Sequence, residues 1–130
     1  MALKRIWIGD KTYPMKMDLN VLAELQEIYG TIGTFERKLL GYDFLKNKDG
    51  TQRYNDAGEP MIIKREPCIR AIADALPLII NEGLAIEAAE QGKRYEPVPK
   101  EKIMEECDID YTVLSEMIHA EFARCFVTKK

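Results

Sequence analysis

The chain has 130 residues, of which 46% are hydrophobic and 32% charged, and its formal net charge is −3. This length and composition are typical of one soluble globular domain rather than a disordered chain. The basic residues are scattered among the acidic ones, so we expect no nucleic-acid partner, because phosphate binding requires a concentrated basic face.

The N-terminal segment, residues 1–17, predicts a β-hairpin. Two short runs, LKRIWIG and TYPMKM, flank the turn sequence GDK. The alternation of side chains along a strand places either Ile6 and Ile8 or Trp7 toward the interior. Pro14 lacks a backbone N–H and therefore suits an edge strand.

Residues 18–40 predict two helices. Asp18 is a favourable N-cap and Gly30 a favourable C-terminal residue for the first helix. Between them, apolar residues recur at helical spacing. These residues are Val21, Leu22, Leu25, Ile28 and Tyr29. A second, shorter helix is expected to begin after Thr34 and to end before Gly41.

Residues 41–66 are richer in turn-forming residues than the rest of the chain, with Asp-Gly and Asn-Asp pairs. The segments DFLK, TQRY and MIIK between these turns predict short strands, so we expect a polar insertion that contains a small hairpin. It has too little apolar area to fold alone. A mobile surface loop is the alternative interpretation.

The remainder, residues 67–126, predicts helices. Pro67 suits the first position of a helix. Pro77 must kink or split this helix, because proline lacks a backbone N–H and clashes with the preceding turn. Two helices near 67–76 and 77–91 are therefore as compatible with the sequence as one bent helix.

Two further helices are expected in the C-terminal part. Pro99 begins a short one, and Asp108 or Asp110 caps the last, over residues 111–126. The apolar stripe of this last helix consists of Tyr111, Leu114, Met117, Ile118, Phe122 and Cys125. The expected fold is mainly α with a small N-terminal β-hairpin (α+β), a compact helical domain over residues 1–130 with a β-hairpin-like insertion.

The segment AIADALPLIINEGLAIEAA, residues 71–89, is one of the most apolar in the chain. A membrane span requires about 20 mostly apolar residues. Asp74, Pro77 and Glu82 interrupt this run, so we expect no membrane association. Its apolar residues cover nearly every angle of a helix, which leaves a central core helix or a surface that faces a partner. The candidate partner-binding residues are Ile69, Ile72, Leu76, Ile79, Ile80, Leu84, Met117, Phe122 and Phe126.

Motifs for catalysis or metal binding are missing from the sequence. His119 is the only histidine. Glu116 precedes it by three residues, but a di-iron site requires a second such pair, so a partly exposed polar residue is the simpler interpretation. The sequence holds no phosphate-binding glycine motif, and its three cysteines form no CxxC pair, which favours reduced thiols. We therefore expect no cofactor and no enzymatic activity.

The stretch IGDKTYPMKMDLNVLAELQEIYG, followed by FERKLLG, resembles the tail assembly chaperones of long-tailed phages and prophages. In that family a glycine and a tyrosine precede an alternating strand and a helix that begins with D-[LFY]-N-x-L. The residues that carry the resemblance are Gly9, Tyr13, Asp18, Leu19, Asn20, Leu22, Leu25, Glu27, Tyr29 and Gly30. The later stretches CIRAIADALPLIINEGL and LSEMIHAEFARCF resemble the family's second and terminal helices, and residues 41–66 form an insertion relative to its shorter members.

The resemblance implies a non-catalytic chaperone that binds the tape-measure protein and keeps its apolar helices soluble until the tail tube polymerises around it. Such a protein acts in the cytoplasm of the bacterial host and is not expected in the mature virion. The resemblance leaves open whether the protein also binds the tail tube protein and whether it forms a homo-oligomer. Many members exist in two lengths through a ribosomal frameshift, and Lys129-Lys130 is compatible with an A-rich slip site.

A small structural or head–tail connector protein of a phage particle is the alternative function. Mass spectrometry of purified virions distinguishes the two, because a connector stays in the finished particle and a chaperone leaves it.

Overall fold

A computed structural model describes residues 3–127. Five helices and two small antiparallel sheets make up the fold, which confirms the predicted α+β class with an N-terminal hairpin. The elements in chain order are β1 (Lys4–Ile8), β2 (Lys11–Met15), α1 (Leu19–Tyr29), α2 (Ile32–Leu40), β3 (Tyr42–Phe44), β4 (Ile62–Lys64), α3 (Ile69–Glu90), α4 (Lys100–Glu106) and α5 (Tyr111–Arg124).

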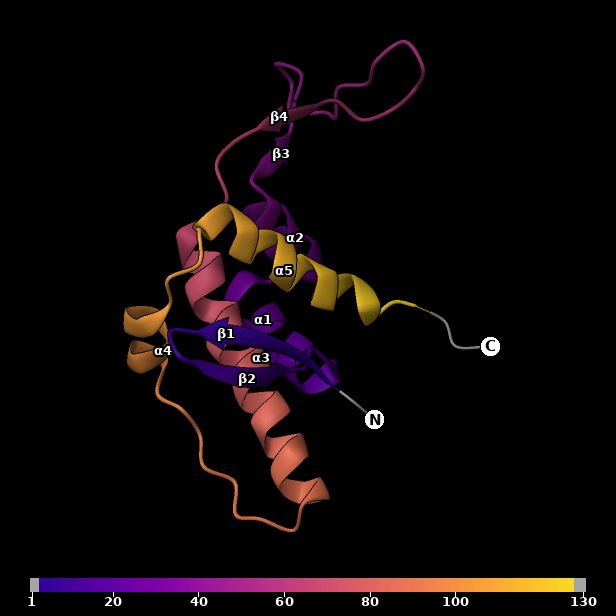
Figure 1. Ribbon diagram of the computed structural model, residues 1–130. Helices are drawn as coiled ribbons and strands as arrows, with labels where there is room; N and C mark the ends of the chain where they lie inside the picture. Colours follow the sequence, from indigo (N-terminus) through magenta and orange to yellow (C-terminus); the bar gives the residue numbers. More distant parts are fainter. Residues whose placement is uncertain (1–2, 128–130) are drawn as a thin grey trace.

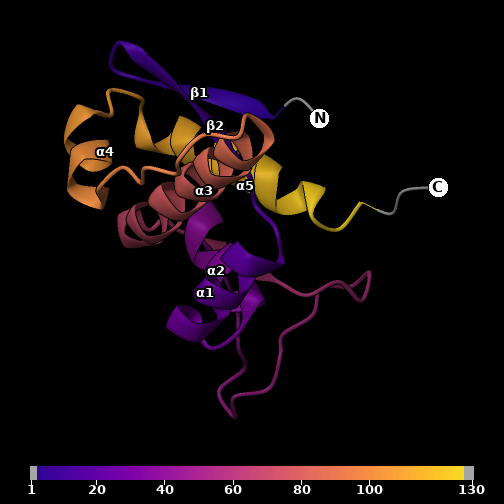
Figure 2. The same ribbon diagram turned by 90° about the horizontal axis from the view of Figure 1, so that it is seen from below.

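The long helix α3 runs through the middle of the molecule (Figure 1). The β1–β2 hairpin lies across one side of it, and α1 and α2 pack on the opposite side, as the view from below shows (Figure 2). Helix α5 contacts both α2 and α3, and α4 contacts α3 near its middle. Helix α3 is thereby the element around which the others assemble, and its apolar residues form the centre of the core.

The hairpin pairs Lys4 with Met15 and Ile8 with Lys11, in antiparallel register. Ile6 and Ile8 face the core, and Trp7 is 63% exposed, so the structure selects the first of the two orientations left open by the sequence.

Strand β2 lies directly on α3. The backbone N–H of Lys16, just past the strand, donates to the Ile79 carbonyl at 2.9 Å. A Cβ atom built on Gly83 would lie 2.6 Å from the carbonyl oxygen of Pro14. The missing side chain of Gly83 therefore allows the strand to approach the helix this closely.

Helix α3 continues through Pro77 as one helix of 22 residues, so the alternative of two separate helices is wrong. Pro67 precedes the N-cap, Cys68, rather than occupying the first helical position as expected. Helix α2 begins at Ile32, earlier than predicted, because the Thr31 hydroxyl caps it by accepting from the Thr34 backbone N–H at 3.0 Å. Thr34, the expected start, thus lies inside the first turn.

The caps predicted for α1 and α5 are confirmed. The Val21 backbone N–H donates to Asp18 at 3.2 Å, and Gly30 ends α1 with a φ of 83°. Asp110, one of two candidates, caps α5 by accepting from the Thr112 backbone N–H at 2.8 Å.

Residues 42–64 form an arm that projects from the helical body (Figure 1). Strands β3 and β4 pair from Tyr42–Lys64 to Phe44–Ile62, and isolated bridges continue the pairing farther out. This arrangement confirms the hairpin-like insertion. At the base of the arm, the Arg65 backbone N–H donates to the Gly41 carbonyl at 2.5 Å, so the two ends of the arm meet.

An aromatic row links three helices of the body. Neighbouring ring centroids lie 5.5 Å apart for Tyr29 and Phe35, 5.9 Å for Phe35 and Phe122, and 5.1 Å for Phe122 and Phe126. Phe35 lies in the core, and the row reaches solvent at Phe126, which is 58% exposed. Within residues 3–127, each helix is too short or too polar to cross a bilayer.

Candidate functional site

Five of the nine residues predicted to bind a partner lie in the core instead. Ile72, Leu76, Ile79, Ile80 and Phe122 are at most 5% exposed. The cause is that the hairpin, α1, α2 and α5 together cover α3, so its apolar faces are buried within this chain. These five residues are inaccessible to a partner in the folded protein, which corrects their assignment.

The other four predicted residues are accessible but do not form one surface. Ile69 and Phe126 are 63% and 58% exposed, and Leu84 and Met117 are half-buried. Leu84 lines a shallow hollow of about 220 Å³ among charged residues at the C-terminal end of α3. Met117 lines a groove with an apolar floor, so of the four it points most directly to a binding surface.

This groove, called here the α5 groove, lies between the open end of the hairpin and α5 and has a volume of about 230 Å³. Its lining consists of Lys4, Arg5, Met15, Met117, Ala120, Glu121 and Arg124. The two methionines and Ala120 form the floor, and the charged residues form the rim. The groove thus combines a deformable apolar base with a hydrophilic border.

Ion pairs hold two of the rim residues in place. Arg5 pairs with Glu87 of α3 at 2.5 Å, and Arg124 pairs with Glu121 at 2.8 Å. Glu121 is almost fully buried, so its pairing with Arg124 satisfies a charge at the edge of the core. The Arg124 guanidinium thereby stays beside the floor.

Exposed apolar residues lie close to the end of α5. The Cys125 thiol donates to the Met17 carbonyl at 3.0 Å, which brings the end of α5 against the segment that leads into α1. On either side of this contact, Leu19 is 82% exposed and Phe126 is 58% exposed. The sequence singles out Leu19 through its place in the D-L-N stretch. Its exposure follows from the tertiary packing and is not apparent from the sequence.

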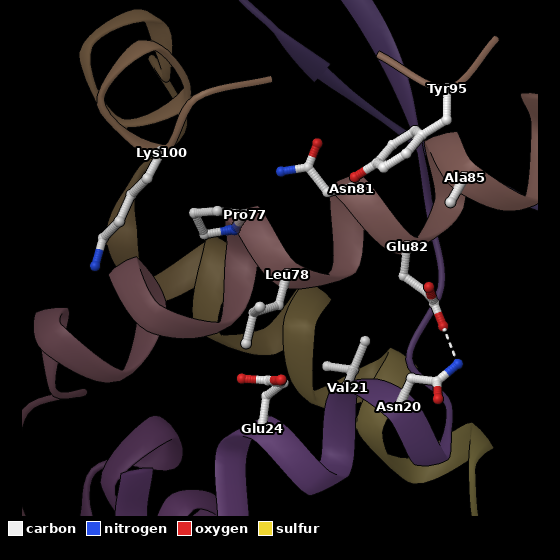
Figure 3. Close-up of a pocket in the computed structure, with 10 residues that line it drawn as sticks. All are labelled: Asn20, Val21, Glu24, Pro77, Leu78, Asn81, Glu82, Ala85, Tyr95 and Lys100. Carbon is white, nitrogen blue, oxygen red and sulfur yellow. Dashed lines mark hydrogen bonds between the residues drawn. The ribbon is translucent and has the colours of Figure 1, made fainter. Parts of the chain in front are cut away.

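A second and larger groove, the α1–α3 groove, lies between α1 and the middle of α3 and has a volume of about 470 Å³ (Figure 3). Its lining consists of Asn20, Val21, Glu24, Pro77, Leu78, Asn81, Glu82, Ala85, Tyr95 and Lys100. No sequence motif indicates these residues as a binding site. Asn20 and Val21 belong to the stretch that carries the family resemblance, which is the signal that could have indicated them.

Hydrogen bonds fix the walls of the α1–α3 groove. Asn20 donates through Nδ2 to Glu82 at 2.9 Å and so links the two helices (Figure 3). The Asn81 amide donates to the Val98 carbonyl at 3.0 Å and accepts from the Val98 N–H at 2.7 Å. Both polar groups of Asn81 are therefore occupied, and the loop that carries Tyr95 is held over the groove.

A partly buried hydrogen-bonded chain lies at the end of the groove near Lys100. The Tyr29 hydroxyl donates to Asp74 at 2.8 Å, and Lys100 pairs with the same carboxylate at 3.2 Å. Burial and the Asp74 carboxylate raise the pKa of Tyr29 above its usual range. Lys100 is therefore engaged by Asp74 and does not neutralise the carboxylates farther along the groove.

Replacing Glu82 with glutamine is expected to raise the thermal midpoint at pH 7. The carboxylates of Asp18 and Glu82 lie close enough to share a proton, which, with burial, raises the pKa of Glu82. The folded protein therefore binds this proton more readily than the unfolded chain, and the resulting stability is lost as the pH rises through the raised pKa. Glutamine cannot ionise and still accepts from Asn20.

The difference in midpoint between the variant and the wild type should vanish at about pH 4, where the glutamate is largely protonated. Thermal unfolding followed by circular dichroism at both pH values measures this. An equal difference at the two pH values would show that ionisation of Glu82 is not the cause.

The side chain of the single histidine, His119, contacts a glutamate and an aromatic ring. His119 Nε2 lies 2.9 Å from Glu36 Oε2, and its ring stacks on Phe122 at 5.8 Å. It is partly exposed, as interpreted from the sequence, and its contact with Glu36 links α5 to α2.

Burial raises the pKa of the Cys125 thiol, which disfavours a nucleophilic thiolate. In the described part of the chain, no three His, Cys, Asp or Glu side chains gather as metal ligands would.

Comparisons of this chain with protein-family models, curated proteins and solved structures found no match.

Proposed function

We propose that this protein is a phage tail assembly chaperone, which binds the tape-measure protein non-catalytically and keeps it soluble during tail tube assembly. The observation that carries the proposal is the α5 groove, in which Met15, Met117 and Ala120 form an apolar floor inside a charged rim. The resemblance of the first 30 residues to tail assembly chaperones supports it, since Met15 belongs to that stretch.

The physical basis is the binding of an apolar helix in a groove. An apolar cavity of about 150 Å³ can hold benzene, so a groove of about 230 Å³ accommodates a leucine or phenylalanine side chain of a partner helix. Methionine side chains are flexible and polarisable, and they adapt to anchors of different shape. This property suits a chaperone that must cover many different apolar stretches of one long protein.

The neighbouring exposed residues extend the apolar contact beyond the groove. Leu19 and Phe126 lie on either side of the contact between Met17 and Cys125, at the same end of the molecule. A partner helix anchored in the groove can cover them as well. The proposal places the protein in the host cytoplasm, and it predicts that the protein is missing from the mature virion.

Replacing Ala120 with tryptophan is expected to abolish capture of the tape-measure protein, because the indole would fill the floor of the α5 groove. Ala120 is exposed, so the change should leave the fold intact. The measurement is the soluble fraction of the tape-measure protein of the same genome, co-expressed with each chaperone variant. Wild-type protein should keep it soluble, and the variant should not.

Ala123→Trp is the matched control, because Ala123 is an exposed alanine on the same helix that does not line the groove. This control should keep the partner soluble, and circular dichroism should show that both variants are folded. If the two variants behaved alike, the α5 groove would not be the binding surface. If wild-type protein left the tape-measure protein insoluble, the proposed function itself would be wrong.

A further inference from the structure

The α1–α3 groove is wider than a site for one apolar side chain, and its charge differs from that of the α5 groove. Its floor is apolar and is formed by Val21, Pro77, Leu78 and Ala85. Figure 3 shows Leu78 and Val21 pointing toward one another between the helices, with the charged side chains placed around them. Such a surface favours an amphipathic guest over a purely apolar one.

We propose that the α1–α3 groove binds an arginine or lysine side chain presented by a helical segment of a partner protein. The charged head of this side chain lies between Glu24 of α1 and Glu82 of α3, and its aliphatic stem lies on the apolar floor. This site is separate from the α5 groove and does not depend on the identity of the partner bound there.

The charge of the lining is the first argument. Glu24 and Glu82 contribute two negative charges from opposite walls, and Lys100 contributes one positive charge that Asp74 already neutralises. Neither glutamate forms an ion pair with any residue between positions 3 and 127. A cation from outside the chain would compensate this excess.

The position of Glu82 beside the start of α1 is the second argument. Asn20, in the first turn of the helix that Asp18 caps, donates to the Glu82 carboxylate at 2.9 Å. The Asp18 carboxyl and burial raise the pKa of Glu82, so the repulsion between the two carboxylates is costly when both are ionised. A guanidinium or ammonium group beside Glu82 relieves this repulsion, whereas an anionic guest increases it.

The aromatic wall is the third argument. Tyr95 is 42% exposed, and its ring lies beside Asn81, whereas Glu82 points from the same helix toward Asn20 (Figure 3). Burial and the negative charge of Glu82 raise the pKa of Tyr95. A cation held between an aromatic ring and a carboxylate gains from both. Arginine and lysine also bury their stems on apolar surface while the head stays in water.

The size of the groove favours a helical segment over a free small cation. About 470 Å³ exceeds the space that one side chain needs, since a cavity of about 150 Å³ already holds benzene. A cationic side chain and an apolar neighbour one helical turn away both fit on the floor. The walls are preformed by the Asn20–Glu82 and Asn81–Val98 hydrogen bonds, so binding requires little rearrangement.

The test uses three synthetic helical peptides that are identical except at two positions, which carry arginine, glutamine or glutamate beside a leucine anchor. Each is titrated into ¹⁵N-labelled full-length protein. The arginine peptide should shift the amide signals of Asn20, Leu78, Ala85 and Tyr95, and its affinity should fall with added salt. The glutamate peptide should leave these signals unchanged.

The double variant Glu24→Gln/Glu82→Gln should bind the arginine peptide about fivefold to tenfold more weakly, as expected for the loss of two partly exposed ion pairs. The double variant Glu27→Gln/Glu90→Gln is the matched control. It removes the same charge from exposed positions of the same two helices that do not line the groove, and it should bind like the wild type.

Equal weakening in the two double variants would overturn the proposal, because binding would then follow overall charge. Signal shifts confined to the α5 groove, or equal affinity for the arginine and glutamate peptides, would overturn it as well. The result is independent of tape-measure capture, since the peptides report on one groove and Ala120→Trp on the other.

Discussion

Replacing Gly83 with alanine is expected to lower the free energy of unfolding by about 2 kcal/mol. In most helices this change is favourable by about 1 kcal/mol, because alanine has the higher helix propensity. Here the new Cβ would lie 2.6 Å from the Pro14 carbonyl oxygen and 3.0 Å from the Met15 nitrogen. Both are backbone atoms, so the hairpin must move off α3. Overpacking of this kind typically costs about 1–3 kcal/mol or more.

Gly33→Ala is the matched control for this prediction. Gly33 also lies inside a helix, but its Cβ would meet only the ends of two side chains at 3.5 Å or more. Urea unfolding of both variants should show lower stability for the first change and equal or higher stability for the second. A stabilised Gly83→Ala protein would mean that the close contact between β2 and α3 is wrong.

Replacing Gly41 with alanine is expected to have a larger effect, a loss of about 3 kcal/mol. Gly41 ends α2 with a φ of 80°, which costs an L-residue about 1–2 kcal/mol. In addition, its Cβ would lie 2.6 Å from the backbone of Arg65, Glu66 and Pro67, where the arm returns to the body. The steric conflict adds to the strain, since neither side of the contact can rotate away.

Gly30→Ala separates the two contributions. Gly30 ends α1 with a similar φ of 83°, although its ψ is −44° where that of Gly41 is 45°, and a Cβ there would meet nothing within 4 Å. Denaturant unfolding should therefore show a loss of about 1–2 kcal/mol for Gly30→Ala, from backbone strain alone. Similar losses in both variants would indicate that the base of the arm can open to admit a side chain.

Local signals in the sequence predicted much of the fold. Asp18, Gly30 and Asp110 act as helix caps because their chemistry depends on a few neighbouring residues. The start of α2 was misplaced because Thr31 and Thr34 are both suitable caps, and the choice depends on which hydroxyl meets a free N–H. The sequence alone does not decide between the two threonines, whereas the tertiary structure does.

The burial of α3 could not be predicted, for a different reason. Its sequence shows that apolar residues cover nearly every angle, but not whether they meet this chain or a partner. The hairpin covers the side near Ile79 and Gly83, and this contact joins residues more than 60 positions apart in the sequence. Proline at position 77 likewise suggested a break, yet packing on all sides keeps the helix continuous.

Both grooves are also products of tertiary packing. The α5 groove joins the two ends of the described chain, and the α1–α3 groove joins α1, α3 and the loop before α4. Their residues are individually unremarkable in sequence, as exposed alanines, asparagines and glutamates usually are. Met117 was selected because it lies on an apolar stripe, whereas Glu24 and Tyr95 gave no such signal.

The closed base of the arm has a consequence for how this gene can change. The chain leaves the body at Gly41 and returns at Arg65, and these residues are joined by a backbone hydrogen bond of 2.5 Å. Exchange of the intervening segment for a two-residue turn, a longer module or a fluorescent reporter would leave the flanking chain on the same path, because the junction needs no extra length. The arm can therefore be replaced as a unit, and its sequence can vary in length and content without disturbing either groove.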